Sequence, residues 1–132
     1  MSPDLATPPA PAFRIAAALM AALFVVAAAV QWNDPDPFYW IAIYGVAALL
    51  AARGAQGQLP LPPNAAALVV FTVLALRALP DLLGARAEAF THWKMTAASD
   101  EVAREAGGLA LCAAWSAVQT AVAVSARRRS AS

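Results

Sequence analysis

The stretch IAAALMAALFVVAAAVQW, residues 15–32, contains no charged residue, and the turn sequence NDPDP, residues 33–37, follows it directly. A helix of this length is about 27 Å long, which is close to the thickness of the hydrocarbon core of a bilayer. A residue that precedes proline avoids the α-helical region, so Asp34 and Asp36 are expected to interrupt the helix. We therefore predict a membrane-spanning helix that is followed by a short turn into a second helix.

The composition of the chain agrees with this prediction, because its 132 residues are 61% hydrophobic and only 13% charged. Soluble domains are about half apolar and about a quarter charged. A globule of the present composition could not cover its surface with polar groups, which excludes a soluble single-domain enzyme. Arg127–Arg129, the basic cluster of the sequence, follows an apolar run, which is typical of a membrane-topology signal and gives no support for nucleic-acid binding.

Charged residues and prolines divide the chain into four apolar segments. We predict an all-α, integral membrane four-helix bundle over residues 13–126, with spans at about 13–32, 37–53, 64–83 and 99–126. Asn64, which follows Pro62 and Pro63, is expected to cap the third helix.

The two ends of the chain differ from the spans in composition. The proline-rich residues 1–12 are expected to form a disordered leader, and residues 127–132 a basic tail, both in the cytoplasm. A cleaved signal peptide is an alternative for residues 1–30, because Arg14, the apolar run and Ala27–Ala29 imitate one. The run is, however, longer than a usual signal core.

The basic residues predict the orientation of the bundle. Five of them (Arg14, Arg53 and Arg127–Arg129) fall at one end of the predicted spans, and three (Arg86, Lys94 and Arg104) fall at the other. The positive-inside rule therefore places both termini in the cytoplasm of the cell, in the inner membrane if the source is bacterial. The opposite, outer end then holds seven of the eight acidic residues.

Two polar segments, residues 31–37 and 99–105, are expected to meet at this outer end. Capping and turn formation explain Asp36, which precedes Pro37, but they explain Asp34 less well and do not explain Gln31. Glu105 lies beyond the first turn of its helix, where capping no longer applies. We predict that the fourth helix brings Glu101, Arg104 and Glu105 toward Asp34.

An ionisable group at the lipid boundary usually has a partner, so the predicted cluster has two interpretations. It acts either as a structural brace of carboxylates and arginines or as a site for a divalent cation or small ligand. The candidate binding residues are Gln31, Asn33, Asp34, Asp36, Arg77, Glu101, Arg104 and Glu105. The candidate metal ligands are Asp34, Asp36, His92, Glu101 and Glu105.

Other functions have less support. A single histidine excludes a bis-histidine haem within one chain, and no motif indicates a nucleotide or flavin. Two alternatives to a binding protein remain open. One is a membrane enzyme on a lipid-borne substrate, with Asp34 or Glu105 as general acid or base. The other is a transporter or channel subunit, whose pore would require an oligomer.

Residues 31–44 resemble the signature of the transmembrane protein 220 family, with Gln31-Trp32-Asn33-Asp34-Pro35-Asp36 followed by Trp40 and Tyr44. The acidic stretch that ends at Arg104-Glu105, with Gly108-Leu109 after it, is similar to that family's later motif. The resemblance implies a small four-span integral membrane protein in the lipid bilayer. It implies no particular activity or cofactor. Gly107 and Gly108 also permit close packing of the fourth helix against a neighbour.

Overall fold

The computed structural model describes residues 8–83 and 98–131, and these residues form helices without any strand. The elements are α1 (Pro11–Ala29), the short 3₁₀ helix η2 (Val30–Asn33), α2 (Pro37–Ala55), α3 (Leu61–Leu83) and α5 (Ala98–Ala131). All four α-helices include a stretch that is long and apolar enough to cross a membrane. The prediction of an all-α protein with four spans is confirmed.

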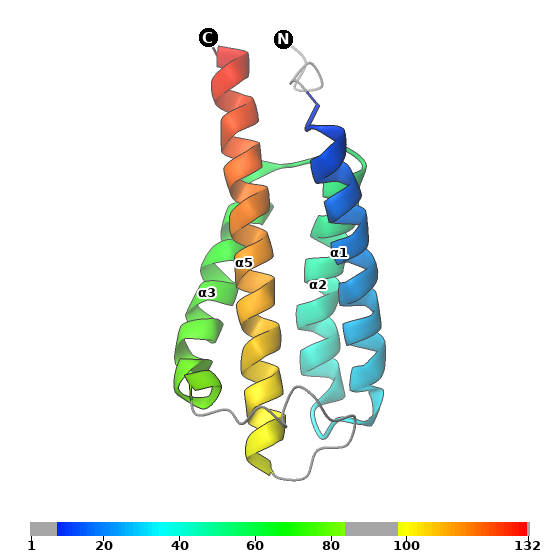
Figure 1. Ribbon diagram of the computed structural model, residues 1–132, viewed down its shortest axis with the longest axis vertical. Coiled ribbons are helices and arrows are strands. Elements are labelled where there is room, and N and C mark those ends of the chain that lie inside the picture. The colour runs from blue at the N-terminus through cyan, green and yellow to red at the C-terminus, as the bar shows by residue number, and fades with distance from the viewer. Residues whose placement is uncertain (1–7, 84–97, 132) are drawn as a thin grey trace.

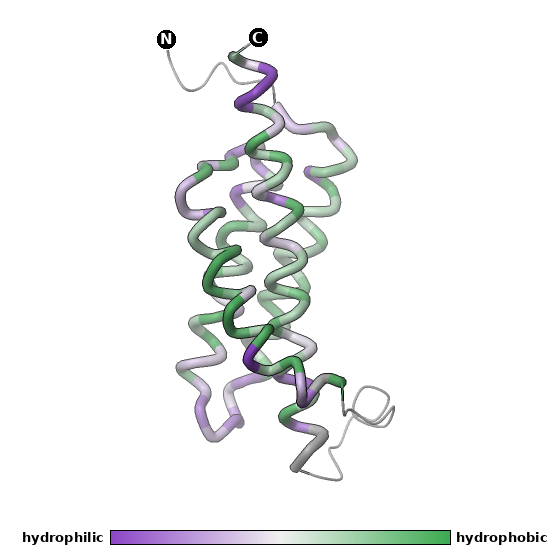
Figure 2. The backbone as a smooth tube through the Cα atoms, turned by 90° about the vertical axis from the view of Figure 1, so that its left-hand side faces the viewer, coloured by the Kyte–Doolittle hydropathy of each residue, from purple (hydrophilic) through white to green (hydrophobic). Residues whose placement is uncertain are grey.

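The helices are arranged as two hairpins (Figure 1). Helix α1 packs along α2, and α3 packs along α5, while α2 and α5 also contact each other between the hairpins. The start of α1, the α2–α3 linker and the end of α5 lie at one end of the bundle, and η2 lies at the other. Figure 2 shows that hydrophilic residues gather toward these two ends and that hydrophobic residues dominate between them.

Proline and glycine residues determine where the helices of the first hairpin begin and where α2 ends. Pro11 and Pro37 each stand at the first turn of a helix, where the missing N–H costs nothing. Helix α2 ends at Ala55, and Gly57, two residues later, has a φ of 82°, a left-handed conformation that favours glycine. There the Gln58 N–H donates to the Arg53 carbonyl at 2.8 Å, and the Gly57 N–H donates to the Gly54 carbonyl at 3.0 Å. These two bonds form a Schellman motif, which satisfies the last carbonyl groups of the helix.

The start of α3 differs from the prediction. The helix begins at Leu61, so Pro62 and Pro63 occupy its first turn, and Asn64 is not its N-cap. Proline is well suited to the first turn because the N–H groups there have no partner within the helix. The Asn64 side chain is buried and donates to the Pro60 carbonyl at 2.8 Å. The cap prediction was wrong because the two prolines lie within the first turn of the helix instead of preceding it.

The structure describes only parts of the predicted leader and of the predicted tail. Helix α5 continues to Ala131, through the arginine cluster for which a separate tail was predicted. Its length is about 50 Å, so it extends beyond a hydrocarbon core of about 30 Å. Of the expected leader, residues 1–7 lie outside the described residues, Pro9 is buried, and α1 begins at Pro11.

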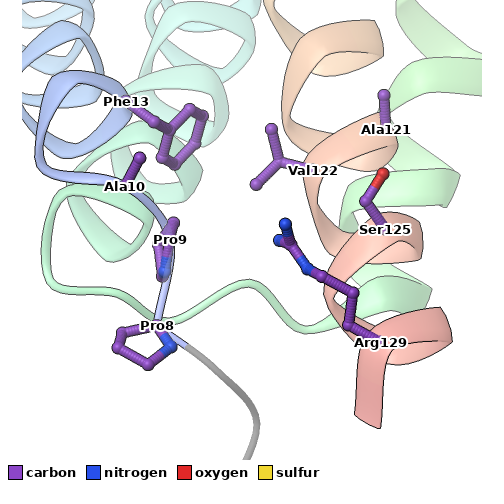
Figure 3. A pocket seen from close by; sticks show the side chains of 8 residues that line it. All are labelled: Pro8, Pro9, Ala10, Phe13, Ala121, Val122, Ser125 and Arg129. Atoms are coloured by element: carbon purple, nitrogen blue, oxygen red, sulfur yellow. The ribbon is translucent and has the colours of Figure 1, made fainter. Parts of the chain in front are cut away.

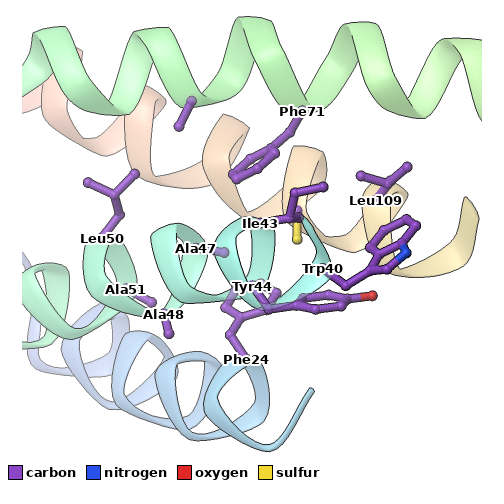
Figure 4. Packing of buried hydrophobic residues seen from close by; sticks show 12 residues of the cluster. Phe24, Trp40, Ile43, Tyr44, Ala47, Ala48, Leu50, Ala51, Phe71 and Leu109 are labelled. Carbon is purple, nitrogen blue, oxygen red and sulfur yellow. The ribbon is translucent and has the colours of Figure 1, made fainter. Parts of the chain in front are cut away.

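The interior of the bundle combines a few large side chains with many small ones. Phe24, Trp40, Tyr44 and Phe71 are buried among alanines that let the helix backbones approach closely (Figure 4). Many other large aliphatic side chains point outward, as for Leu19, which is 67% exposed. In water these outward side chains would form a large apolar patch, whereas in a bilayer they face lipid.

Candidate functional site

Asp34 is positioned by the turn between α1 and α2. It precedes Pro35 and is extended, with φ −75° and ψ 150°. Its N–H donates to the Gln31 carbonyl at 2.9 Å, and its Oδ1 accepts the Asp36 N–H at 3.0 Å. A carboxylate that binds the N–H two residues later forms an Asx turn, which holds its own loop. The half-buried Asp34 side chain is therefore anchored through one carboxylate oxygen.

The other polar residues of the turn have different positions. Asp36 is at the N-cap position of α2, as expected, but its exposed side chain makes no capping hydrogen bond. Gln31 is half-buried and Asn33 is exposed, and both belong to η2. The Asp36 carboxylate is not part of the group of acidic side chains that Asp34 forms with two residues of α5.

The first turns of α5 supply the partners of Asp34. Glu101 and Glu105 are one helical turn apart, so they share a face of α5, and both are half-buried. One carboxylate oxygen from each of Asp34, Glu101 and Glu105 lies within 4.8 Å of the other two. We call these three residues the carboxylate cluster. It joins the first hairpin, through Asp34, to the second hairpin, through α5.

Three carboxylates at this separation repel one another. Two unit charges 4.8 Å apart interact with about 3 kcal/mol at an effective dielectric constant of about 20. Such a cluster needs positive charge, which a cation, a proton or an arginine can supply. Arg104 is half-buried on the same helix and interacts with other groups of the protein. His92, the remaining metal-ligand candidate, lies outside the described residues.

A groove begins beside the carboxylate cluster. Its volume is about 360 Å³, and it is lined by residues of α2, α3 and α5. Glu105 belongs both to the groove and to the carboxylate cluster. Arg77 and Asp81 line the groove from α3, and Tyr39 and Trp40 line it from α2. Arg77, a candidate binding residue from the sequence, thus shares a groove with Glu105.

A second polar group, centred on Gln119, lies among the apolar helices and was not predicted. The Gln119 side chain, only 1% exposed, donates to the Asn64 Oδ1 atom at 2.8 Å and to the Leu50 carbonyl at 3.3 Å. Its Oε1 atom accepts the Trp115 Nε1–H at 2.9 Å. The hydrogen bonds connect α5 with α2 and α3. A glutamine within an apolar run was a sequence signal for such a network, since buried polar groups in a membrane need partners.

A family model described as transmembrane family 220, helix, matches residues 23–121, which include all three members of the carboxylate cluster. No solved structure is significantly similar to the chain.

Proposed function

The chain belongs to the transmembrane family 220, and we propose that this integral membrane protein binds a divalent cation at Asp34, Glu101 and Glu105. The observation that carries the proposal is the convergence of three carboxylate oxygens within 4.8 Å of one another. Calcium–oxygen distances are about 2.3–2.6 Å, so two oxygens on one calcium ion are separated by at most about 5 Å. The spacing of the cluster therefore suits calcium.

The proposed cation also explains how the two hairpins are held together at this end. Asp34 comes from the turn of the first hairpin, and both glutamates come from α5 of the second. A bound cation would neutralise the three charges and connect the two hairpins. The structural brace and the ion site were alternative interpretations of the sequence. With a bound cation, the same three residues would serve both roles.

The arginine distribution supports an extracytoplasmic location for this site. Arg14 is near the start of α1, Arg53 is near the end of α2, and Arg127–Arg129 are near the end of α5. These helix ends lie at the end of the bundle opposite η2 (Figure 1), which the positive-inside rule assigns to the cytoplasm. Extracellular calcium modules have dissociation constants of about 10⁻⁴–10⁻³ M. We expect a value in this range, because only three carboxylates converge on the site.

Thermal unfolding of the full chain in detergent, with calcium or with a chelator, tests the proposal. Calcium at ten times its dissociation constant should stabilise the protein by about 1.4 kcal/mol. Glu105→Gln should abolish this response and should stabilise the calcium-free protein, because one repelling charge is removed. Asp36→Asn is the matched control, since Asp36 is acidic and close in sequence but outside the cluster.

The result that would overturn the cation site is also specific. A brace made only of carboxylates and arginines needs no calcium. It predicts that Glu105→Gln destabilises the protein to the same extent with calcium and with a chelator. If that is observed, and if the unsubstituted protein does not respond to calcium, the proposal is wrong.

A second candidate function is supported by the groove beside Glu105. A membrane enzyme acting on a lipid-borne substrate needs such a groove, in which the Arg77 guanidinium could bind an anionic group and Glu105 could transfer a proton. Incubation in vesicles of phosphatidylethanolamine and phosphatidylglycerol, followed by lipid mass spectrometry, tests this role. A product that disappears with Glu105→Gln, but not with Asp36→Asn, would favour the enzyme.

A further inference from the structure

The groove beside the carboxylate cluster, which we call the Arg77 groove, has a polar end and an apolar end. Helix α3 runs toward the end of the bundle that holds η2, and α5 runs away from it, so Asp81 and Val102 lie nearest that end. Leu74 and Leu109 are each seven residues away along the same helices, so they lie about 10 Å deeper. This order of polar and apolar groups is that of a phospholipid, whose headgroup lies at the membrane surface and whose acyl chains lie below it.

The charged side chains of the Arg77 groove include both signs. Arg77 and Asp81 are one helical turn apart on α3, and both are exposed. Within the part of the chain that the structure describes, Arg77 makes no hydrogen bond and no ion pair, even with Asp81. Its guanidinium is therefore available to bind a phosphate through two parallel hydrogen bonds. Glu105 belongs to the carboxylate cluster, so Asp81 is the groove carboxylate that remains for a positive group.

Two aromatic residues of α2 line the same groove. Tyr39 is 50% exposed, Trp40 is buried, and their rings are nearly perpendicular, with the ring centroids 5.1 Å apart. The exposed ring of Tyr39 is accessible to a ligand in the groove. A cation within about 6 Å of the centroid of an aromatic ring is attracted to the face of the ring. The groove therefore offers an aromatic ring and a carboxylate to a cation, and an arginine to an anion.

A second groove, at the opposite end of the bundle, has a different set of charges (Figure 3). It lies between the start of α1 and the end of α5, and its volume is about 460 Å³. Phe13, which lines it, stacks on Trp115 with the ring centroids 5.7 Å apart. Its polar lining residues are Ser125 and Arg129, and Arg129 already interacts with another group of the protein. No carboxylate of the described residues lines this groove, so it offers no ion-pair partner to an ammonium group.

We propose that the Arg77 groove binds one molecule of phosphatidylethanolamine through its zwitterionic headgroup. The phosphate binds Arg77, and the ammonium group lies between Asp81 and Tyr39. The start of an acyl chain lies against Leu74 and Leu109. The phosphate and the ammonium group of this lipid are joined by a two-carbon linker, which suits two side chains whose Cβ atoms are about 5–6 Å apart.

Two other common headgroups fit the Arg77 groove less well. Phosphatidylglycerol has no ammonium group for Asp81, and the trimethylammonium group of phosphatidylcholine has no N–H to donate to it. The lipid site rests on the groove of the second candidate function and names the lipid class for it, but it requires neither catalysis nor the cation. It is also independent of the orientation of the bundle, because the headgroup is recognised by its own two charges.

Native mass spectrometry tests this site with the full chain released from nanodiscs of equal parts phosphatidylethanolamine, phosphatidylglycerol and phosphatidylcholine. One intact phosphatidylethanolamine molecule should be retained per chain in preference to the other two lipids. Arg77→Gln and Asp81→Asn should each lower this retention at least about tenfold, because a charge-assisted hydrogen bond is lost. Arg53→Gln and Asp36→Asn are the matched controls, since they remove exposed charges outside the groove lining, and they should retain the lipid.

A second pair of variants separates the groove from surface charge. Ala78→Trp fills the groove and keeps every charge, so it should abolish the preference for phosphatidylethanolamine. Leu79→Trp places the same ring at a 39% exposed position of α3 outside the groove lining, and it should keep the preference. Unchanged retention in Ala78→Trp, or equal effects of Asp81→Asn and Asp36→Asn, would overturn the lipid site. Retention of the three lipids in equal amounts, or a preference for phosphatidylglycerol, would also overturn it.

Glu105→Gln distinguishes the lipid site from the proposed functions. This variant should keep intact phosphatidylethanolamine and lose both the response to calcium and any lipid product. Loss of the lipid from Glu105→Gln but not from Asp81→Asn would overturn the assignment of the ammonium group to Asp81. A chain that binds calcium without selecting phosphatidylethanolamine would refute the lipid site alone and leave the cation site intact.

Discussion

Replacing Gly108 with alanine should loosen the contact between α2 and α5. An added Cβ atom at position 108 would overlap the Tyr44 hydroxyl, and it would lie 2.9 Å from Tyr44 Cζ and 3.4 Å from Cε1. Tyr44 is only 7% exposed, and the centroid of its ring lies 6.2 Å from the centroid of the Trp40 ring. The tyrosine ring therefore has little room to move, and either the ring or α5 must shift.

The magnitude of this effect combines two opposing terms. Overpacking of a well-packed interior costs about 1–3 kcal/mol. Alanine is favoured over glycine in a helix by about 1 kcal/mol. Gly45 provides the matched control, because a Cβ atom there would meet no atom within 4 Å. Gly45→Ala should therefore stabilise the protein by up to about 1 kcal/mol, and Gly108→Ala should be less stable than Gly45→Ala by about 2 kcal/mol.

Equilibrium unfolding in mixed dodecyl maltoside and dodecyl sulfate micelles, followed by circular dichroism, measures this difference. Combining Gly108→Ala with Tyr44→Phe should recover part of the loss, because the overlapping hydroxyl is removed. The recovery should be incomplete, since the ring carbon 2.9 Å away remains. If Gly108→Ala and Gly45→Ala have the same free energy of unfolding, the close contact between α2 and α5 does not exist.

Three further substitutions test other parts of the bundle. Gln119→Leu should lower the free energy of unfolding by about 2 kcal/mol in the same micelles, because three hydrogen bonds of about 0.6 kcal/mol each are lost; no change would mean that the network does not hold the helices. Phe13→Leu should cost about 1 kcal/mol through the lost ring stacking, and Leu19→Ala, at a lipid-facing position, should cost less. In a Cys112→Ala background, Ser130→Cys should react with a membrane-impermeant maleimide only after the cells are permeabilised, and reaction in intact cells would reverse the proposed orientation.

The span pattern could be predicted because charged residues are rare and because most of them, like the prolines, lie near or outside the span ends. Pro35 and Pro37 require a break after the first helix, and the structure has its turn there. The meeting of Asp34 with Glu101 and Glu105 was also predicted. It followed from topology, since the first turn and the start of the fourth helix must lie at the same end of a four-span bundle.

The sequence does not predict which face of each helix packs against which neighbour. The helices are apolar on every side, so the sequence has no polar stripe that separates the lipid-facing surface from the interior. Gly108 was expected to permit close packing, but its partner, Tyr44, depends on which helix lies beside α5. The link from Gln119 to Leu50 and Asn64 was missed for the same reason, because it joins three helices that are distant in sequence.

The two grooves also lay beyond prediction from the sequence. Arg129 was interpreted only as a topology signal, because the expected tail had no defined position relative to α1. The continuation of α5 to Ala131 is what places Arg129 beside Pro9 and Phe13. In the same way, Arg77 and Glu105 were both candidates, but the groove that they share depends on the pairing of α3 with α5.

Direct measurement of calcium bound per chain is the most decisive test of the carboxylate cluster. Equilibrium dialysis of the purified full chain in detergent, with ⁴⁵Ca²⁺, should give one ion per chain and a dissociation constant of about 10⁻⁴–10⁻³ M. Asp36→Asn should bind in the same way, and Glu105→Gln should not bind. Absence of binding to the unsubstituted chain, or equal binding by Glu105→Gln, would contradict a cation site at Asp34, Glu101 and Glu105.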